Sequence, residues 1–432
     1  MTPVGTFAGI IATAFLFAAS ARAQVVVCHA DGTSAERVAS QIVAAANAGP
    51  PQAANVSSGW DQTATDGSGL VRGMPITLTW SVVPNGTPIN ATAEISGESS
   101  DNSNLVTYLN EAAELGPQNV WQDTIQTALD GWSNGPGITF VYEPNDDGVL
   151  LGPNPGVLGV RGDIRIGGHD IDGDDGGDSK VVAYAFFPDG GDIVIDTADF
   201  FSTTLFRFRN VIAHEAGHAI GMGHVCPINQ TKLMEPAIST SFNGPQIDDL
   251  LGAHRNYGDL NEDNGLFSNA SDEGFAVDTT VNVNDLALDD DGDEDWFLLP
   301  TGTLTELSVT LNPAGAPYIV GNPTAGGSCT GASTATFDPT LVQDLRIDII
   351  DFDHQTTVAT SQSTGLGGTE SVTDIRMSKL GGFIRVVGAG DDDVQRYELE
   401  VTLVPEPARA LLTAIAVIAI ATIHQRRRRQ AA

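Results

Sequence analysis

The middle of the chain alternates short runs of β-branched and aromatic residues with longer amphipathic stretches. Short apolar runs bounded by turn residues predict strands. Five such runs follow in order, at residues 75–83, 138–143, 163–168, 181–187 and 192–196. Apolar positions at helical spacing predict helices over residues 121–132, 205–221 and 246–258. We therefore expect an α+β domain over residues 73–260, with one sheet and few helices.

The pattern changes beyond Asp259, where strands follow one another without helices. The predicted strands are residues 295–300, 304–311, 345–352, 382–390 and 396–404. Short strands at this spacing are typical of a separate β-sandwich, which we place at residues 264–404. Residues 24–72 are rich in Ala, Gly, Ser and Asn, and we predict only one helix there, at 34–46.

The N-terminal 23 residues have the pattern of a signal peptide. An apolar run ends in Ala21-Arg22-Ala23, which predicts cleavage before Gln24. The alternative is that this run forms a buried first helix.

The C-terminal residues 405–432 also have the pattern of a targeting segment. Pro405-Glu406-Pro407 precedes an apolar stretch at 410–423 and four arginines at 426–429. As a helix the stretch spans roughly 21 Å, which is short for a permanent membrane span. The tail resembles the PEP-CTERM sorting signal of Gram-negative bacteria. That resemblance implies export across the inner membrane, transient membrane association, processing by exosortase-type machinery, and residence at the cell surface or in the extracellular matrix. An ordinary tail anchor is the alternative.

The charge of the chain argues against a nucleic-acid partner. Fifty-five Asp and Glu against 20 Lys and Arg give a formal net charge of −35, which favours divalent cations as counter-ligands or simply keeps the protein soluble. Cys28, Cys226 and Cys329 allow at most one disulfide, and Cys28 with either of the others is one choice. No CxxC occurs, so a metal must be bound by His and carboxylates.

Three histidines in HEAGHAIGMGH, at intervals of four and six residues, predict a metal site. His214 and His218 lie one turn apart on one helical face, and Glu215 beside them suits a general base. His224 can join them only if the helix ends first, which we assign to left-handed Gly221 and Gly223. Three His and an open position are typical of catalytic zinc. The alternative is three buried core histidines.

This segment resembles the metzincin metalloproteases, and its surroundings resemble the matrixin branch. Met234 and Pro236 match the Met-turn, and residues 244–259 match the closing helix. The resemblance implies one catalytic zinc bound by His214, His218 and His224, with Glu215 as the base and Met234 beneath the metal. It also implies that strand 181–187 is an edge strand on which an extended substrate pairs. The residues involved would be Ala183, Tyr184 and Ala185.

Departures from the matrixin pattern are as informative as the matches. Of the four residues that bind a second zinc in matrixins only His169 is present, because Ile171, Tyr184 and Val194 replace the others. We therefore expect no second zinc and no cysteine switch, since the surroundings of Cys28 do not match. Calcium is expected at carboxylates that match the family or lie beside its positions, although solvated acidic turns are the alternative. These carboxylates are Asp163, Asp175, Asp192, Asp196 and Asp199.

The β-sandwich resembles the bacterial pre-peptidase C-terminal domain through residues 286–300 and YELEVTL, which implies an accessory module. Asp289, Asp291, Asp293 and Asp295 in this segment are either calcium ligands or an exposed turn. Together the patterns predict a monomeric, secreted, zinc-dependent endopeptidase that acts on extracellular proteins or peptides. The alternative is a non-catalytic, calcium-stabilised surface or adhesion protein built on a metalloprotease scaffold.

Overall fold

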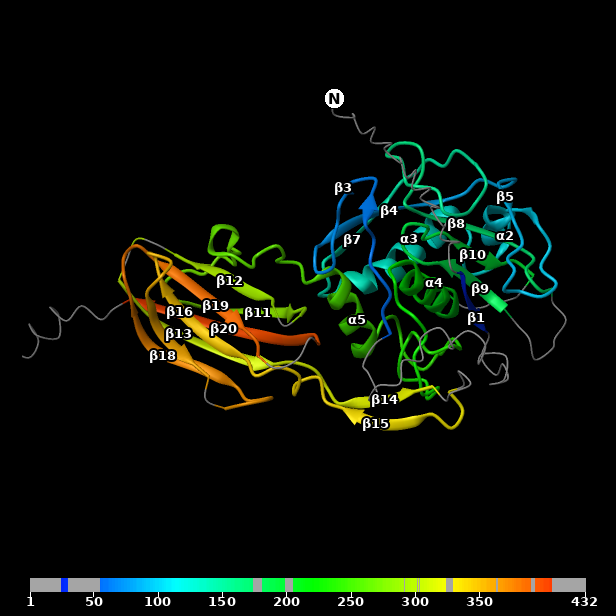
Figure 1. The fold of residues 1–432 in the computed structure, drawn as a ribbon. Helices are drawn as coiled ribbons and strands as arrows, with labels where there is room; N and C mark the ends of the chain where they lie inside the picture. The colour runs from blue at the N-terminus through cyan, green and yellow to red at the C-terminus, as the bar shows by residue number, and fades with distance from the viewer. Residues whose placement is uncertain are drawn as a thin grey trace, which may run out of the picture.

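The computed structural model shows two lobes, an α+β lobe followed by a β-rich lobe (Figure 1). It describes the backbone of residues 25–29, and residues 55–173, 181–198, 205–290, 292–300, 302, 304–323, 329–362, 364–389 and 393–405. Several predictions lie outside these residues: the signal peptide, the helix at 34–46, Asp175, Asp199, Asp291 and the tail beyond Pro405. Within the described part of the chain, no helix has both the length and the apolar character needed to cross a membrane.

The α+β lobe is built on a six-stranded sheet in the order β1-β9-β10-β8-β4-β7. Strands β4, β7, β8 and β10 run parallel, whereas β9 is antiparallel to β10 and β1 is antiparallel to β9. The strands are β1 (Val25–His29), β4 (Ile76–Val82), β7 (Ile138–Tyr142), β8 (Ile164–His169), β9 (Val181–Phe186) and β10 (Ile193–Asp196). The five strands predicted here are confirmed.

The prediction that strand 181–187 lies at the sheet edge is wrong for this conformation. The sixth strand, β1, pairs along β9 and takes the edge, with Val26 opposite Ala185 and Val27 opposite Tyr184. Sequence reasoning saw no structure at residues 25–29, because a five-residue apolar run next to the expected cleavage site blends into the signal peptide. The expected five-stranded sheet therefore has six strands.

Helices α3 and α4 pack together beside the sheet and share its core (Figure 1). Trp132 joins them, since its indole N–H donates to the carbonyl of Ala213 at 2.8 Å. The helices are α2 (Leu105–Glu111), α3 (Gln118–Asp130, followed by the 3₁₀ turn Gly131–Ser133), α4 (Leu205–Ala219) and α5 (Ile247–Tyr257). The three predicted helices are confirmed to within three residues. The short pairs β2 (Gln62–Thr63) with β3 (Gly67–Ser68), and β5 (Pro88–Ile89) with β6 (Asp101–Asn102), lie in the loops.

The β-rich lobe consists of two four-stranded antiparallel sheets that share one apolar core. Their orders are β11-β20-β13-β18 and β12-β19-β16-β17. The strands are β11 (Thr279–Leu288), β12 (Glu294–Leu299), β13 (Thr305–Pro313), β16 (Arg346–Asp351), β17 (Thr357–Ser361), β18 (Glu370–Met377), β19 (Gly382–Val387) and β20 (Gln395–Pro405). A 3₁₀ turn (Phe267–Asn269) precedes them. Burial alternates along β13 and β20, as expected for strands with one face on a core.

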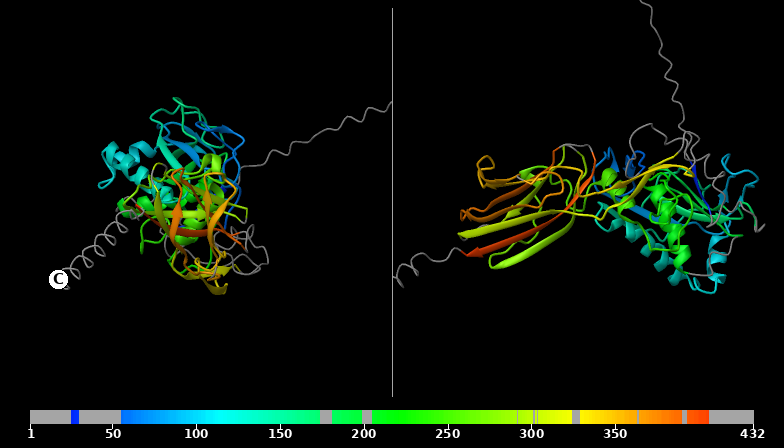
Figure 2. Two further views of the ribbon diagram at one scale, coloured as in Figure 1. Left: turned by 90° about the vertical axis from the view of Figure 1, so that its left-hand side faces the viewer. Right: turned by 90° about the horizontal axis from the view of Figure 1, so that it is seen from below.

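A hairpin from the β-rich lobe, β14 (Tyr318–Asn322) and β15 (Ser333–Phe337), reaches back beside the α+β lobe (Figures 1 and 2). A disulfide joins Cys226 of the α+β lobe to Cys329 next to the hairpin, with Cα atoms 5.3 Å apart. The pairing of Cys28 with either residue, left open by the sequence, is therefore not adopted. A small apolar cluster around Leu251, Ala287 and Val394 fills the junction between the lobes.

Candidate metal centre

Helix α4 and the loop after it bring three imidazoles together in the α+β lobe. His214 and His218 project from successive turns of α4, and His224 follows the helix end. Their Nε2 atoms lie 3.1 Å (His214 to His218) and 3.2 Å (each to His224) apart. All three side chains are buried. The three histidines thus form a compact triangle of nitrogen atoms, as the spacing predicted.

The other ring nitrogens set the protonation of the triangle. His214 Nδ1 lies 2.7 Å from the carbonyl of Leu233, and His218 Nδ1 lies 2.7 Å from that of Met222. A carbonyl only accepts, so each Nδ1 carries the proton and each Nε2 turns a lone pair inward. Burial, with His214 nearby, also holds the pKa of His218 well below its usual value. Two neutral rings whose Nε2 lone pairs face the same point could hold a metal cation there.

The triangle fits zinc in size as well as in chemistry. Zn–N bonds of about 2.0–2.1 Å in tetrahedral geometry require N–N separations of about 3.3 Å, close to the 3.1–3.2 Å found here. Among the described residues only one other group gathers three His, Cys, Asp or Glu ligand atoms within 4.8 Å, and it consists of carboxylates. Zinc is therefore the metal that these three residues suit.

The end of α4 turns the chain so that His224 faces the other two histidines. Helix α4 stops at Ala219, and Gly221 has φ of +97°, as predicted. The prediction for Gly223 is wrong, because this residue is not in the left-handed region. Gly223 is instead needed because there is no room for a side chain, since a Cβ would lie 2.5 Å from the Asn55 side chain. Asn55 is distant in sequence, so no local pattern reveals this contact.

Met234 packs against α4 at Gly217, a helix position between His214 and His218. A Cβ on Gly217 would overlap Met234 Sδ and approach Trp132 Cζ2 to 2.7 Å, so this helix position must be glycine. Asp249, at the start of α5, accepts the N–H groups of Leu233 (2.8 Å) and Met234 (3.0 Å). Burial and neighbouring Asp248 raise the pKa of Asp249 to about 7. Sequence reasoning matched Asp249 to the closing helix but missed its role of holding the Met-turn.

Glu215 is fully buried one residue after His214 on α4. Phe187, just beyond β9, lies edge-on to His218 with ring centroids 6.1 Å apart. The C-terminal end of β9 therefore leads to the histidine triangle. Ala183, Tyr184 and Ala185 of β9 are buried, and their backbones pair with β1.

A polar network occupies the region around His169, where matrixins bind their second zinc. Both His169 Nε2 (2.9 Å) and Tyr184 Oη (3.1 Å) contact Glu98 Oε1. Burial, with Glu98 nearby, raises the pKa of the Tyr184 hydroxyl, which keeps it protonated as a donor. Glu98 lies in a loop without a recognisable pattern, so its partnership with residues more than 70 positions away could not be predicted.

The described carboxylates for which calcium was predicted are bonded to protein groups. Asp163 accepts the N–H groups of Ala64 and Thr79 (both 2.8 Å), and Asp192 accepts those of Gly152 and Arg165 (both 2.9 Å). Asp196 accepts the N–H of Ala198 at 2.7 Å. They stabilise the loops around β8 and β10, and calcium binding there stays a prediction.

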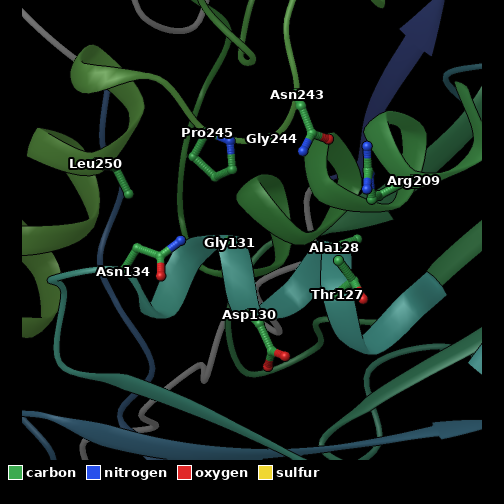
Figure 3. Close-up of a pocket in the computed structure, with 10 residues that line it drawn as sticks. All are labelled: Thr127, Ala128, Asp130, Gly131, Asn134, Arg209, Asn243, Gly244, Pro245 and Leu250. Atoms are coloured by element: carbon green, nitrogen blue, oxygen red, sulfur yellow. The ribbon is translucent and has the colours of Figure 1, made fainter. Parts of the chain in front are cut away.

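The loop between Pro236 and Gln246 is tied to α4 by one side chain. Asn210 Nδ2 donates to the carbonyls of Ser239 (2.9 Å) and Phe242 (2.8 Å), and Oδ1 accepts the Gly244 N–H (3.1 Å). A separate pocket of about 300 Å³ opens between α3, Arg209 of α4 and residues 243–245 (Figure 3). None of the three histidines lines it.

Comparison with known proteins agrees with this geometry. Residues 101–258 match the family model of the matrixin peptidases. This stretch is similar to a matrixin domain. The matched region contains the histidine triangle, Glu215, Met234 and α5, and it supports a metalloprotease. No curated protein matches the chain.

Proposed function

We propose that the protein is a secreted zinc-dependent endopeptidase that hydrolyses extracellular proteins or peptides. The observation that carries the proposal is the triangle of Nε2 atoms with two Nδ1 atoms held by carbonyls, next to a buried Glu215. The matrixin match over residues 101–258 supports the same chemistry. Secretion, the monomeric state, processing by sorting machinery, transient membrane association and a location on the surface or in the matrix of a Gram-negative bacterium rest on the sequence patterns alone.

Each residue of the site has its own role in peptide hydrolysis. Bound to His214, His218 and His224, zinc supplies Lewis acidity toward the scissile carbonyl and the attacking water. Glu215 accepts the proton of that water at its carboxylate and returns it to the nitrogen of the leaving amine. Burial of Glu215 strengthens the interaction of its carboxylate with charges in the site, because little water screens them. Met234 and Asp249 keep the loop carbonyl of Leu233 on His214 Nδ1 and so fix the ring that binds the metal.

An extended substrate would approach along β9, whose end leads to His218. Pairing of main chain to main chain at Ala183, Tyr184 and Ala185 gives affinity without demanding one sequence. Because β1 pairs with these residues in the structure, a substrate strand has to displace it first.

Substitution of Glu215 by Ala tests the proposal, with Glu400→Ala, at an exposed residue of β20, as the matched control. Casein digestion should fall by at least about a hundredfold in Glu215→Ala, the scale of a lost general base, while zinc content measured by atomic absorption stays at one per chain. The Glu400→Ala control should keep full activity, and a chelator should abolish the activity of both wild type and this control. Wild-type protein that binds zinc but digests neither casein nor peptide mixtures would favour the non-catalytic surface protein instead.

A further inference from the structure

A second group of ligand atoms lies at the junction of the two lobes. Oxygen atoms of Glu262, Asp293 and Asp295 lie within 4.8 Å of one another. Glu262 follows α5 by five residues, whereas Asp293 and Asp295 lie at the start of β12. Three carboxylates from two chain segments therefore meet where the α+β lobe passes into the β-rich lobe.

Proximity of carboxylates alone does not make a site, but the bonding of these side chains is incomplete. Asp295 is fully buried; its Oδ2 accepts the hydroxyl of Tyr397, while Oδ1 has no hydrogen-bond partner. Oε1 of Glu262 is also buried without a partner. A buried carboxylate oxygen without a donor costs free energy unless a ligand satisfies it.

Asn264, whose backbone N–H donates to Glu262 Oε2 at 3.3 Å, adds a third unsatisfied group. It is fully buried, and neither its Oδ1 nor its Nδ2 has a partner. Its backbone carbonyl accepts the N–H of Trp296 at 3.1 Å, which keeps it next to the residue that follows Asp295. Unsatisfied oxygen atoms on both segments are what a bound ion would use.

The electrostatics favour a cation. Among the described residues, no Lys, Arg or His forms a salt bridge with Glu262, Asp293 or Asp295. Asp293 and Asp259 lie close enough to Glu262 for their negative charges to repel its carboxylate. Asp293 and Asp290 repel the carboxylate of Asp289 in the same way. A divalent cation would remove both the repulsion and the unsatisfied oxygens.

We infer that Glu262, Asp293 and Asp295 bind one calcium ion that fastens the two lobes together. The ligands are all oxygen atoms, which suits a hard cation and not zinc. The Asn264 side chain and nearby backbone carbonyls can complete the six to eight oxygen ligands that calcium takes. This site is separate from the histidine triangle, and its existence does not depend on proteolysis.

The consequence is a lobe arrangement that depends on calcium. The ion would add to the apolar cluster and to two hydrogen bonds at the same junction: Asp259 accepts the N–H of Ala287 at 2.9 Å, and Arg255 donates to the carbonyl of Asp289 at 2.9 Å. Strand β11 ends on the side of the β-rich lobe that faces α5 (Figure 1). An ion bound between Glu262 and β12 would hold that face in position.

Calcium stoichiometry of the full chain tests the inference. Isothermal titration of zinc-loaded protein is compared between wild type and the variants Glu262→Gln and Asp293→Asn. The matched control is Asp374→Asn, an exposed residue of β18 with φ of +57°, which Asn tolerates. We expect each site variant to bind one calcium fewer, or that calcium at least about tenfold more weakly, while the control matches wild type. Stoichiometry and affinity unchanged in both site variants would overturn the inference.

Terbium luminescence gives a readout that does not alter the carboxylates. Trp296 adjoins Asp295 and is the only tryptophan beyond residue 132. Excitation of tryptophan should produce terbium emission that calcium displaces and that Trp296→Phe reduces by more than half. Retained casein digestion in Trp296→Phe would show an intact fold independently of the calcium site. Emission that survives unchanged in this variant would place the ion elsewhere and contradict the proposal.

Discussion

Removal of the disulfide between Cys226 and Cys329 should destabilise the protein and loosen the metal centre. The two residues are 103 positions apart. A cross-link that closes a loop of this length restricts the unfolded chain by about 4.7 kcal/mol in the loop-entropy description, and measured effects are commonly about 2–5 kcal/mol. We therefore expect Cys226→Ser/Cys329→Ser to lose about 2–5 kcal/mol of unfolding free energy.

The same change should affect zinc, because Cys226 follows His224 by two residues. The disulfide holds the β14–β15 hairpin against the loop after His224: Cys226 forms a β-bridge with Gly321, and Lys232 Nζ donates to the carbonyl of Ile319 at 3.4 Å. When the cross-link is absent, the loop that carries His224 loses its outer support. We expect the double variant to release zinc to a chelator several-fold faster than wild type.

Urea denaturation followed by circular dichroism and tryptophan fluorescence measures the stability change. Four of the five tryptophans belong to the α+β lobe, so the two probes separate the lobes if they unfold in sequence. Cys28→Ser is the matched control and should behave as wild type. A double variant within about 1 kcal/mol of wild type, or a peptide map that links Cys28 to either cysteine, would refute the reasoning.

Three further changes address the α+β lobe. Deletion of residues 24–29 uncovers β9 and should lower KM for extended peptides about five- to thirtyfold, the effect of about 1–2 kcal/mol of β1 docking, with kcat unchanged; an unchanged or higher KM in steady-state assays would argue against competition at β9. Asp249→Asn places an amide N–H opposite the backbone N–H of Leu233 or Met234, so the free energy of unfolding in urea should fall by about 1–3 kcal/mol. Wild-type stability of this variant would contradict the role of Asp249 in the Met-turn. Gly217→Ala should lower the thermal midpoint, because the added methyl overlaps Met234, whereas in an open helix it would raise stability.

The histidine triangle could be predicted from sequence because each requirement is local. Two ligands on one helical face fix an interval of four, and the third needs a turn that Gly221 provides within three residues. The main strands and helices could be predicted for the same reason, since the spacing of apolar residues within each element indicates its type. The sequence did not predict β11, β14, β15, β17 and β18 of the β-rich lobe. In β15 four of the five residues are exposed, so the strand shows no alternation.

Features that join distant segments could not be read in this way. The pairing of β1 with β9, the choice of Cys329 as the partner of Cys226, and the position of Glu98 between His169 and Tyr184 depend on tertiary packing. Nothing in the residues next to each of these groups differs from an ordinary loop or strand. Such partners are decided by which segments the sheet and helices bring together.

The acidic run at residues 289–295 shows how the fold separates residues that look alike in sequence. Read as a string, its carboxylates suit an exposed turn and a calcium loop equally well. Strand β12 breaks this equivalence, because successive side chains point to opposite faces. Glu294 turns toward Arg385 at 2.7 Å, whereas Asp295 turns into the interior beneath Tyr397. Asp290 stays on the turn and accepts the N–H of Gly292 at 2.7 Å. The net charge of −35 therefore has no single role, since part of it is solvated and part is buried in the cluster for which we propose a calcium ion.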